Sequence, residues 1–472
     1  MEPLSPLDAA FLEIEDADPA VVLAIASVAV AEGPAPSQRE LVAEFTARLP
    51  LIPRYRQKIH RVPLDLGTPS WVDDPDFDPV RQFHRVAVPG PGDEAGLCEL
   101  VGMLMAQRLD RDRPLWECWV IEGLAGGRWA ILSKVHHCLA DGVSGNTLHE
   151  VFFREQDRPP PPLRPAEPSP GRMPLLAAAL RDMVAGPLTT LRAAFGALTK
   201  PRALAGRVTE ASQGLEALMR AVIPVSPSSL SGPIGRMRRY ELAHASLPKV
   251  VAIAKAFDVT VNDVVLAAIT AAYRELLLSR GEEPAADSVR TLVPVSVRRE
   301  VEIGRMNNQV SLMLPLLPVD IADPALRLVT VHRRLAELKG HREAEAGVAV
   351  TTSARYGPYA PLAWTIRAAA RLPHRNVVSV ATNVPGPRHT LSILGREVTD
   401  LYPYVPIAMR LRTGVAVLTY RDRMSFGITA DAATAPEPGL MAAAIERDLT
   451  TLSRTARTKK KKTVVPKRNS SH

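Results

Sequence analysis

The chain has very little cysteine and no long hydrophobic run. Its 472 residues include only three cysteines, Cys98, Cys118 and Cys138. Their odd number and their spacings match neither a disulfide framework nor a zinc or redox motif, so we expect a reduced, cytoplasmic protein. No stretch reaches about 18 apolar residues, and the N-terminus lacks the basic region and apolar core of a signal peptide. The sequence therefore predicts neither a membrane span nor export by that route.

Most of the chain also lacks an excess of basic charge. The net charge is +8, but eight basic residues and no acidic residue follow Leu449, so the rest is close to neutral. Nucleic-acid-binding folds spread basic residues over a face of the domain, and we therefore expect no nucleic-acid partner. Residues 453–472 are predicted to form a basic disordered tail. That tail is either only solvated or weakly attracted to an anionic lipid surface.

The length and the 46% hydrophobic content are sufficient for two domains with substantial cores. Prolines crowd residues 157–170, where neither a helix nor a central strand can form, and residues 174–223 have an Ala- and Leu-rich helical composition. We predict an N-terminal domain at 1–156, a Pro-rich linker and helical connector at 157–235, and a C-terminal domain at 236–452. The helical part either packs across both domains or lies on a lipid surface.

Helix and strand patterns alternate in both halves. Ser37 can cap a helix that runs to Arg48, and apolar spacing predicts helices at 93–108 and 261–280. Gly126-Gly127 predicts a hairpin turn. Strands are predicted at 117–122, 128–135, 289–297, 309–317, 376–382, 414–420 and 424–430. The fold class is therefore mixed α/β, with two successive domains of sheet and helices.

One segment indicates catalysis. Residues 136–142 form an HHxxxDG pattern at the end of the predicted strand 128–135. A neutral imidazole, with an unperturbed pKa near 6.5, can take a proton from an alcohol and pass it on. A carboxylate four residues later, Asp141, can orient the loop that holds His137, and Gly142 permits backbone conformations that other residues resist. The pattern suits a general base on a rigid loop.

Other interpretations of this segment compete with catalysis. A metal site is not expected for His136 and His137, because adjacent strand residues point to opposite faces and no third ligand lies at zinc-site spacing. Two structural histidines in a core remain an open alternative on the motif alone. We expect Cys138 to be a small packing residue, because no separate base for it is apparent. Ser144 lies in a segment like a Gly-x-Ser-x-Gly elbow, but Asn146 replaces the last glycine, which favours a turn or cap residue.

Further segments give the chain a family resemblance that spans about residues 4–450. The chain resembles the bacterial wax ester synthase/diacylglycerol acyltransferases, and among them most closely the triacylglycerol synthases. Each segment is weak alone, but their order and spacing are highly specific. The segments are Ser5-Pro6-Leu7-Asp8, Pro114-Leu115-Trp116-Glu117, the HHxxxDG segment, Asn262-Asp263, Pro294-Val295-Ser296-Val297-Arg298, Asn308-Gln309-Val310-Ser311, Asn383-Val384-Pro385-Gly386-Pro387, and Tyr402-Pro403 with Pro406. One departure is Asn307-Asn308, where the family commonly has Gly-Asn.

The resemblance implies two coenzyme-A-dependent acyltransferase-like domains with the reaction centre in a tunnel between them. It implies that His137, next to His136, is the base and that Asp141 is structural. The implied substrates are a long-chain acyl-CoA and either diacylglycerol or a long-chain alcohol, met at a membrane or lipid-droplet surface. No cofactor or metal is implied. The other motif residues, implied to be structural or to bind substrate, are Gly142, Pro114, Leu115, Trp116, Asp263, Arg298, Asn383, Pro385 and Gly386.

The acyl-transfer chemistry needs a general base and a donor to the oxyanion. An alcohol has a pKa far above 7, so its attack on a thioester needs a base, which His137 can supply before it protonates the departing thiolate. Asn262 is the candidate donor to the oxyanion, with a plain helix N-cap as its alternative. Arg298 is expected as an ion partner of Asp141.

Two other functions compete with this interpretation. A peptide-synthetase condensation domain or a polyketide-linked acyltransferase shares the HHxxxDG pattern, but the Pro114 and Asn383 segments argue against it. A non-catalytic lipid-surface scaffold could retain the fold, although the presence of His137 and Asp141 disfavours that role.

Overall fold

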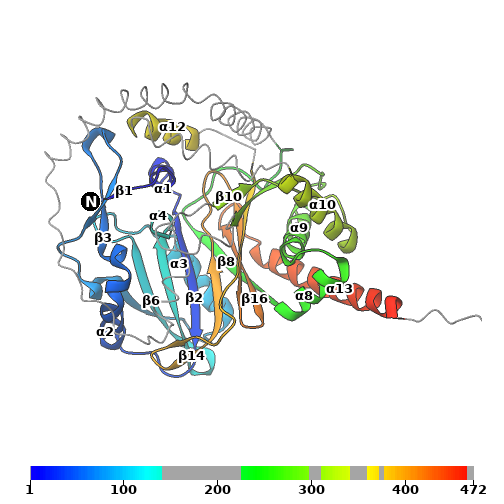
Figure 1. The fold of residues 1–472 in the computed structure, drawn as a ribbon, viewed down its shortest axis with the longest axis horizontal. Helices are drawn as coiled ribbons and strands as arrows, with labels where there is room; N and C mark the ends of the chain where they lie inside the picture. The colour runs from blue at the N-terminus through cyan, green and yellow to red at the C-terminus, as the bar shows by residue number, and fades with distance from the viewer. Residues whose placement is uncertain (1, 141–224, 297–309, 341–358, 372–376, 465–472) are drawn as a thin grey trace, which may run out of the picture.

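The computed structural model describes residues 2–140, 225–296, 310–340, 359–371 and 377–464. Two mixed β-sheets lie side by side in it, and helices cover both (Figure 1). This arrangement confirms the predicted mixed α/β class with two sheet-containing domains. The predicted Pro-rich linker and most of the helical connector, at 157–224, fall outside the described residues.

The first sheet carries the HHxxxDG segment. Its order is β13-β14-β2-β7-β6-β5, with β13 at Ser392–Ile393, β14 at Arg396–Tyr404, β2 at Ala24–Ala31, β7 at Arg128–His136, β6 at Trp116–Leu124 and β5 at Phe83–Ala87. Strands β6 and β7 are antiparallel, and the turn between them holds Gly126 and Gly127 at φ 77° and 69°. A side chain resists this backbone region, so the Gly-Gly pair fixes the predicted hairpin.

Helices of the N-terminal half include one that begins at the cap predicted from the sequence. The helices are α1 at Pro6–Ala17, α2 at Gln38–Arg48, α3 at Glu94–Met105 and α4 at His137–Ala140. Ser37 forms a capping box with Glu40 at the start of α2, as predicted, and Asp93 caps α3. A small sheet of β1 (Glu2–Pro3), β4 (Ser70–Asp73) and β3 (Gln57–His60) lies beside them.

The second sheet belongs to the C-terminal half. Its order is β10-β9-β12-β15-β16-β8, with β10 at Val310–Met313, β9 at Val289–Ser296, β12 at Ser379–Val384, β15 at Thr413–Tyr420, β16 at Arg423–Asp431 and β8 at Arg238–Ser246. Its helices are α8 at Leu247–Phe257, α9 at Val261–Ser279, α10 at Pro324–Gly340 and α13 at Pro438–Val464. The strand predicted at 309–317 is two strands, because β10 ends before Pro315 and β11 (Leu316–Leu317) pairs separately with β9. Proline cannot donate to a strand ladder.

The predicted C-terminal domain at 236–452 is not one structural unit. Strand β14 pairs with β2 over residues 398–404, so it extends the sheet of the N-terminal half. Helix α12 (Tyr359–Arg371) packs on α1, where Tyr359 and Arg367 both contact Glu13 (Figure 1). Long-range pairing of this kind has no local sequence signal, which explains why the prediction missed it.

The two halves meet along α3 and β8. A Cβ atom on Gly102 of α3 would lie 2.7 Å from the carbonyl oxygen of Arg238, so only glycine allows this approach. Tyr240 donates to the carbonyl of Pro403 at 2.7 Å, and His244 lies 3.0 Å from Glu94. That ion pair raises the pKa of His244. These contacts hold the second sheet against the first.

The prediction of a disordered tail from residue 453 is wrong for residues 453–464. Helix α13 continues to Val464, and its apolar side buries Leu452 and Ala456 in the core of the C-terminal half. The basic end of α13 extends away from the body of the molecule (Figure 1). Residues 453–464 are therefore helical, and Ala456 continues the buried side of α13 into this stretch.

Candidate active site

The HHxxxDG segment lies where β7 ends and α4 begins. His136 is the last residue of β7, and its N–H donates to the carbonyl of Leu115 at 3.0 Å. His137 opens α4, and its N–H donates to the carbonyl of Leu23 at 2.8 Å. Both bonds continue the ladders to the strands on either side, so the two histidines are held by a rigid sheet, as the sequence predicts.

Helix α1 lies against this segment. Ser5 caps α1 and also donates to the carboxylate of Asp8 at 2.7 Å. The ring of Phe11 lies 4.1 Å from the ring of His137, centroid to centroid. Glu15, one turn after Phe11, faces His136. Residues four apart share one face of a helix, so α1 presents an aromatic ring and a carboxylate to two adjacent histidines.

His136 is buried and has neighbours on both ring nitrogens. Its Nδ1 accepts the N–H of Cys138 at 3.2 Å and lies 2.9 Å from the Sγ of the same residue. Its Nε2 lies 3.3 Å from Oε2 of Glu15, within ion-pair distance but outside the angles of a hydrogen bond. Burial lowers the pKa of His136 although Glu15 opposes the shift. His136 is thus neutral at pH 7, with Nδ1 as acceptor and the proton on Nε2.

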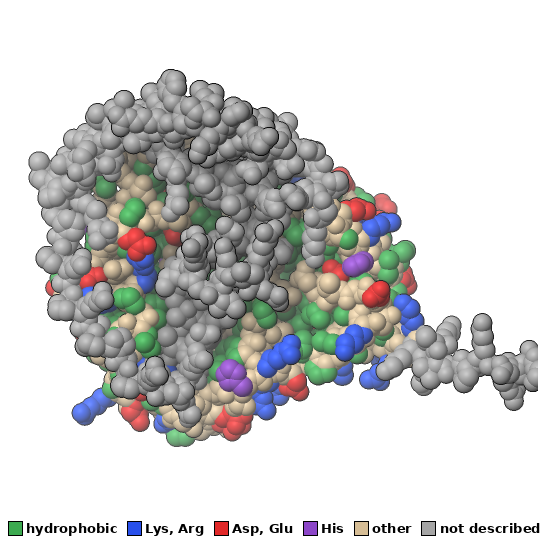
Figure 2. All heavy atoms as spheres, in the orientation of Figure 1, with side chains coloured by type: hydrophobic (Ala, Val, Ile, Leu, Met, Phe, Trp, Pro, Cys, Tyr) green, Lys and Arg blue, Asp and Glu red, His purple; other side chains and the backbone are tan. Residues whose placement is uncertain are grey.

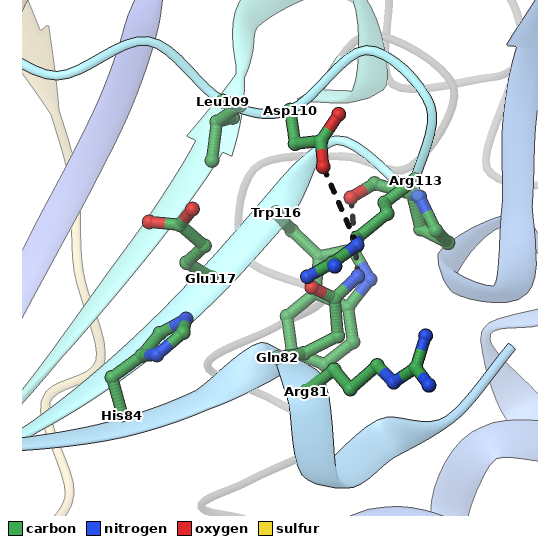
Figure 3. A pocket seen from close by; sticks show the side chains of 9 residues that line it. Arg81, Gln82, His84, Leu109, Asp110, Arg113, Trp116 and Glu117 are labelled. Atoms are coloured by element: carbon green, nitrogen blue, oxygen red, sulfur yellow. Dashed lines mark hydrogen bonds and ion pairs between the residues drawn. The ribbon is translucent and has the colours of Figure 1, made fainter.

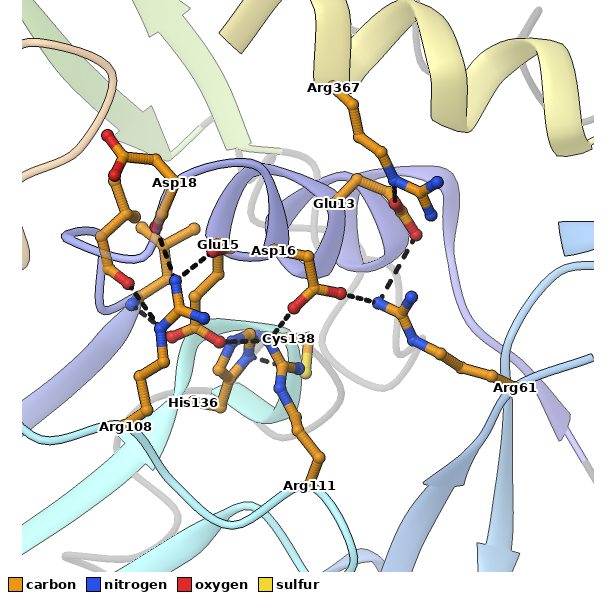
Figure 4. Close-up of polar contacts among 12 residues, drawn as sticks. Glu13, Glu15, Asp16, Asp18, Arg61, Arg108, Arg111, His136, Cys138 and Arg367 are labelled. Carbon is orange, nitrogen blue, oxygen red and sulfur yellow. Dashed lines mark hydrogen bonds and ion pairs between the residues drawn. The ribbon is translucent and has the colours of Figure 1, made fainter. Parts of the chain in front are cut away.

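Glu15 is an ionised carboxylate in a buried position. Burial raises its pKa, but His136, Arg111 and the N–H of Leu23 together outweigh burial and lower it to about 2. Leu23 donates to Oε1 at 2.9 Å, and Arg111 forms an ion pair with Oε2 (Figure 4). Opposite charges and donated hydrogen bonds favour the charged form of a carboxyl group.

His137 is held in the form that a base requires. Burial lowers the pKa of His137 to about 4, and repulsion between the protonated forms of His137 and His136 adds to the shift. The ring is therefore neutral at pH 7. Among the described residues, none hydrogen-bonds to its buried Nδ1. Asp141, the partner that the sequence predicts, lies outside them.

Cys138 has a closer base than the sequence suggested. We expected no base beside this thiol, yet Nδ1 of His136 lies 2.9 Å from its Sγ. Burial nevertheless raises the pKa of Cys138 well above its usual range, and Asp8 adds to the shift. A thiol that stays protonated is a poor nucleophile. The geometry therefore agrees with the predicted packing role.

The Pro114-Leu115-Trp116 segment supports the histidines from the neighbouring strand. The carbonyl of Pro114 accepts from Gln82 at 3.1 Å, and the carbonyl of Leu115 accepts from His136. Trp116 is fully buried and donates through its indole N–H to the carbonyl of Tyr55 at 2.7 Å. All three residues act through packing and backbone contacts, which fits a structural role.

The other motif residues meet in the C-terminal half. Asn383 at the end of β12 donates to Oδ1 of Asn262 at 3.2 Å. Asn262 is the second residue of α9, whose N-cap is Thr260, so the N-cap alternative for Asn262 is wrong. The bond turns the Asn262 oxygen toward Asn383 and leaves its NH₂ group pointing away from Asn383. Within the described parts of the chain, no hydrogen bond joins this pair to the histidines.

Asp263 has a structural place in the same helix. Its carboxylate accepts the N–H of Thr260 at 2.8 Å in a capping box and lies 2.8 Å from Nδ1 of His332. Asp263 is buried, so these contacts fix the start of α9. They also set the orientation of its neighbour Asn262.

The Pro385-Gly386 segment after β12 lies close to the backbone of β15. The N–H of Gly386 donates to Thr419 at 3.0 Å, and a Cβ atom on Gly386 would lie 2.0 Å from the carbonyl oxygen of Thr419. Pro385 is exposed beside it. Glycine is thus required at 386 for this segment to lie on β15.

Several predicted site residues fall outside the described residues. These are Asp141, Gly142, Ser144 and Arg298, so the predicted Asp141–Arg298 ion pair stays a prediction. In the part of the chain that the structure describes, no group of three His, Cys, Asp or Glu side chains could hold a metal ion. Nor is any helix there long and apolar enough to cross a bilayer.

A small polar pocket lies beside the Pro114 segment. It is lined by the side chains of Arg81, His84, Arg113, Trp116 and Glu117, among others (Figure 3). Arg113 forms an ion pair with Asp110 at 3.3 Å. Neither His137 nor Asn262 lines this pocket, so we assign no part of the acyl transfer to it.

Sequence reasoning missed Phe11, Glu15 and Arg111. A signal for the first two was present, because Ser5 and Asp8 are spaced as a capping box that starts a helix. Positions 11 and 15 then fall on one face of that helix. Arg111 has no such signal, because its contact with Glu15 joins residues 96 positions apart.

Comparisons with known proteins identify the family of the chain. The family profile of the wax ester synthase/diacylglycerol acyltransferase catalytic domain matches residues 4–265, and that of the WS/DGAT C-terminal domain matches residues 306–453. The chain is 44% identical over 460 residues to the probable diacylglycerol O-acyltransferase tgs1 of Mycobacterium tuberculosis, with 94% of each chain covered. It is 37% identical over 442 residues to the putative diacylglycerol O-acyltransferase Rv3371 of the same organism, covering 93% of this chain and 87% of the relative.

Solved structures share the fold. The wax ester synthase/diacylglycerol acyltransferase from Marinobacter aquaeolei VT8 aligns with a TM-score of 0.65 at 24% identity, covering 96% of this chain and 100% of that one. The first condensation domain of the CDA synthetase aligns with a TM-score of 0.57 at 15% identity, covering 96% of both chains. At these identities the likeness extends to the architecture alone.

Proposed function

Because the chain belongs to the wax ester synthase/diacylglycerol acyltransferase family, we propose that it transfers the acyl group of a long-chain acyl-CoA to the free hydroxyl of diacylglycerol, with His137 as general base. The observation that carries this proposal is the neutral, rigidly mounted imidazole of His137 at the end of β7. Related chains named as diacylglycerol O-acyltransferases support the acceptor. A fatty alcohol is a second acceptor of the same chemistry.

The proposed reaction needs one base and no covalent intermediate on the protein. His137 takes the hydroxyl proton while the alcohol oxygen attacks the thioester carbonyl. When the tetrahedral intermediate collapses, the carbon–sulfur bond breaks and the imidazolium gives its proton to the coenzyme A thiolate. The ester and free coenzyme A leave, and His137 is neutral again.

We assign the developing oxyanion to Asn262. Asn383 holds the Asn262 oxygen, and Asp263 fixes the helix start around it, so the NH₂ group of Asn262 is pre-oriented as a donor. The first turn of α9 adds a favourable potential for negative charge. Removal of one oxyanion donor typically costs about 3 to 4 kcal/mol of transition-state stabilisation.

A peptide-synthetase condensation activity is disfavoured. The likeness to condensation domains lies at 15% identity, whereas the relatives that cover 94% of the chain at 44% identity are named as acyltransferases. The HHxxxDG segment alone does not distinguish the two activities, because both kinds of protein carry it.

The kinetic order tests the absence of an acyl-enzyme. We expect intersecting double-reciprocal plots when palmitoyl-CoA and dioleoylglycerol are varied, because both substrates must be bound together. Parallel lines, or labelled protein trapped from palmitoyl-CoA alone, would contradict direct transfer. Cys138 is the thiol to examine in that case, since it lies beside His136, and Cys138→Ala is the matched control.

We propose that the basic end of α13 draws the enzyme to anionic lipid, where its water-insoluble acceptor is found. Arg454, Arg457 and Lys459 are exposed there, and Figure 2 shows Lys and Arg side chains on the surface near that end. Lys460, Lys461 and Lys462 follow directly. Each basic residue near an anionic bilayer contributes about 1 kcal/mol.

Sedimentation with liposomes tests this attraction. Changing Lys459, Lys460, Lys461 and Lys462 to Gln should reduce binding to anionic vesicles at low salt, because the charges are lost while the buried Ala456 is kept. Acyl transfer to detergent-dispersed acceptor should stay at the wild-type rate. If the wild type and the variant sediment equally with anionic and with neutral vesicles, the basic end of α13 is only solvated.

A further inference from the structure

Glu15 holds the catalytic segment at two points. Its Oε1 accepts the N–H of Leu23 at 2.9 Å, and its Oε2 lies 3.3 Å from Nε2 of His136. The carbonyl of Leu23 in turn accepts the N–H of His137 at 2.8 Å. The Glu15 carboxylate therefore contacts His136 (Figure 4). It also contacts Leu23, whose carbonyl holds the backbone of His137.

The stretch between Glu15 and Leu23 is itself tied down from both halves of the protein. Arg108 donates to the carbonyl of Val21 at 3.0 Å and to that of Asp18 at 2.6 Å. Arg238 of β8 donates to the carbonyl of Ala20. Leu23 is therefore held in place from both sides, and Glu15 receives its N–H in a fixed position.

Stability alone does not account for a carboxylate at this position. Glu15 is 1% exposed, and its ion pair with Arg111, whose side chain is 32% exposed, must offset the cost of removing the carboxylate charge from water. Buried ion pairs of this kind often contribute little net stability compared with apolar residues. The neighbouring Asp16 also approaches Arg111, at 3.4 Å, but its side chain is 32% exposed, and the structure gives it no contact with His136 or Leu23.

We propose that Glu15 is a positioning residue for acyl transfer, which keeps the His137 ring in one orientation through His136 and the backbone of Leu23. This assignment rests on the proposed role of His137 as base. Cys138 donates its N–H to Nδ1 of His136, so the ring proton lies on Nε2 and faces the Glu15 carboxylate at 3.3 Å. The adjacent His137 ring lies against the ring of Phe11, which projects from the same helix as Glu15.

Glu15→Gln is the direct test. The substitution keeps the size of the side chain and an oxygen for the N–H of Leu23, but it removes the charge that faces His136 and Arg111. We expect kcat to fall about 10- to 100-fold with an unchanged KM for palmitoyl-CoA, since displacement of a reacting group by about 1 Å can cost 10²-fold. Asp16→Asn is the matched control and should keep the wild-type kcat. A wild-type kcat in Glu15→Gln would overturn the assignment.

A double substitution separates positioning from a general structural effect. In a His137→Ala background, Glu15→Gln should cause no further loss of the residual rate, because Glu15 acts through His137. A further loss of the same size as in the wild-type background would show an independent role and overturn the assignment. If Glu15→Gln is poorly folded, Glu15→Gln with Arg111→Gln removes both charges together and is measured in the same way. Full activity of His137→Ala would instead reject the base itself.

Discussion

His137→Ala is expected to lower kcat for acyl transfer by about 10² to 10⁴, the usual contribution of a general base. The ring is neutral and lies directly after β7 against Phe11, whereas the neighbouring His136 faces Glu15. The fold should survive, because the backbone N–H of residue 137 still donates to Leu23. Coenzyme A release with palmitoyl-CoA and dioleoylglycerol measures the loss, and thermal unfolding checks the fold.

A matched histidine serves as the control for this result. His84 lies on β5 of the same sheet and stacks on the ring of Trp119 at 4.4 Å. His84→Ala removes an imidazole of similar exposure but should leave kcat unchanged. A His137→Ala protein as active as His84→Ala would mean that the alcohol is deprotonated by another group.

Trp116→Ala is expected to produce the largest loss of stability. The side chain is fully buried, lies between the rings of Phe45, Phe83 and Tyr55, and donates to the carbonyl of Tyr55. Truncation of a buried Trp costs about 3 to 5 kcal/mol through lost contacts and the cavity left behind. Denaturant unfolding should show this decrease, together with reduced activity, because residue 115 supports His136.

The exposed Trp364 provides the comparison. It lies on α12 with 60% of its surface exposed, so Trp364→Ala should change the free energy of unfolding by no more than about 0.5 kcal/mol. Similar unfolding midpoints for the two variants would contradict the structural role assigned to the Pro114-Leu115-Trp116 segment.

Local patterns in the sequence predicted the elements well. The capped helix at 38–48, the Gly-Gly hairpin and the long helix at 261–279 each depend on residues close in sequence, and each is present. The pairing of β14 with β2 was not predicted, because it joins residues more than 360 positions apart. For the same reason, domain boundaries inferred from composition could not foresee that α12 packs on α1 and that β14 joins the first sheet.

The position of the histidine segment was predictable because its residues are contiguous. Strand, histidines and turn follow one another, so His137 could be placed at the end of β7 from sequence alone. The support of that segment is not contiguous. Glu15 reaches His136 only because α1 packs on α4, and Arg111 reaches Glu15 only because the loop after α3 returns to the same place. The alternative prediction of Asn262 as the N-cap of α9 is wrong, because Thr260, two residues earlier, caps the helix.

The most direct test is acyl transfer by the purified protein with [¹⁴C]palmitoyl-CoA and dioleoylglycerol, in wild-type and His137→Ala forms. Coenzyme A release and labelled lipid are followed in the same reaction. We expect the wild type to release one coenzyme A for each labelled triacylglycerol formed, and the variant to form almost none while retaining its unfolding midpoint. Coenzyme A release by the wild type without labelled triacylglycerol, or an undiminished yield from the variant, would contradict the account.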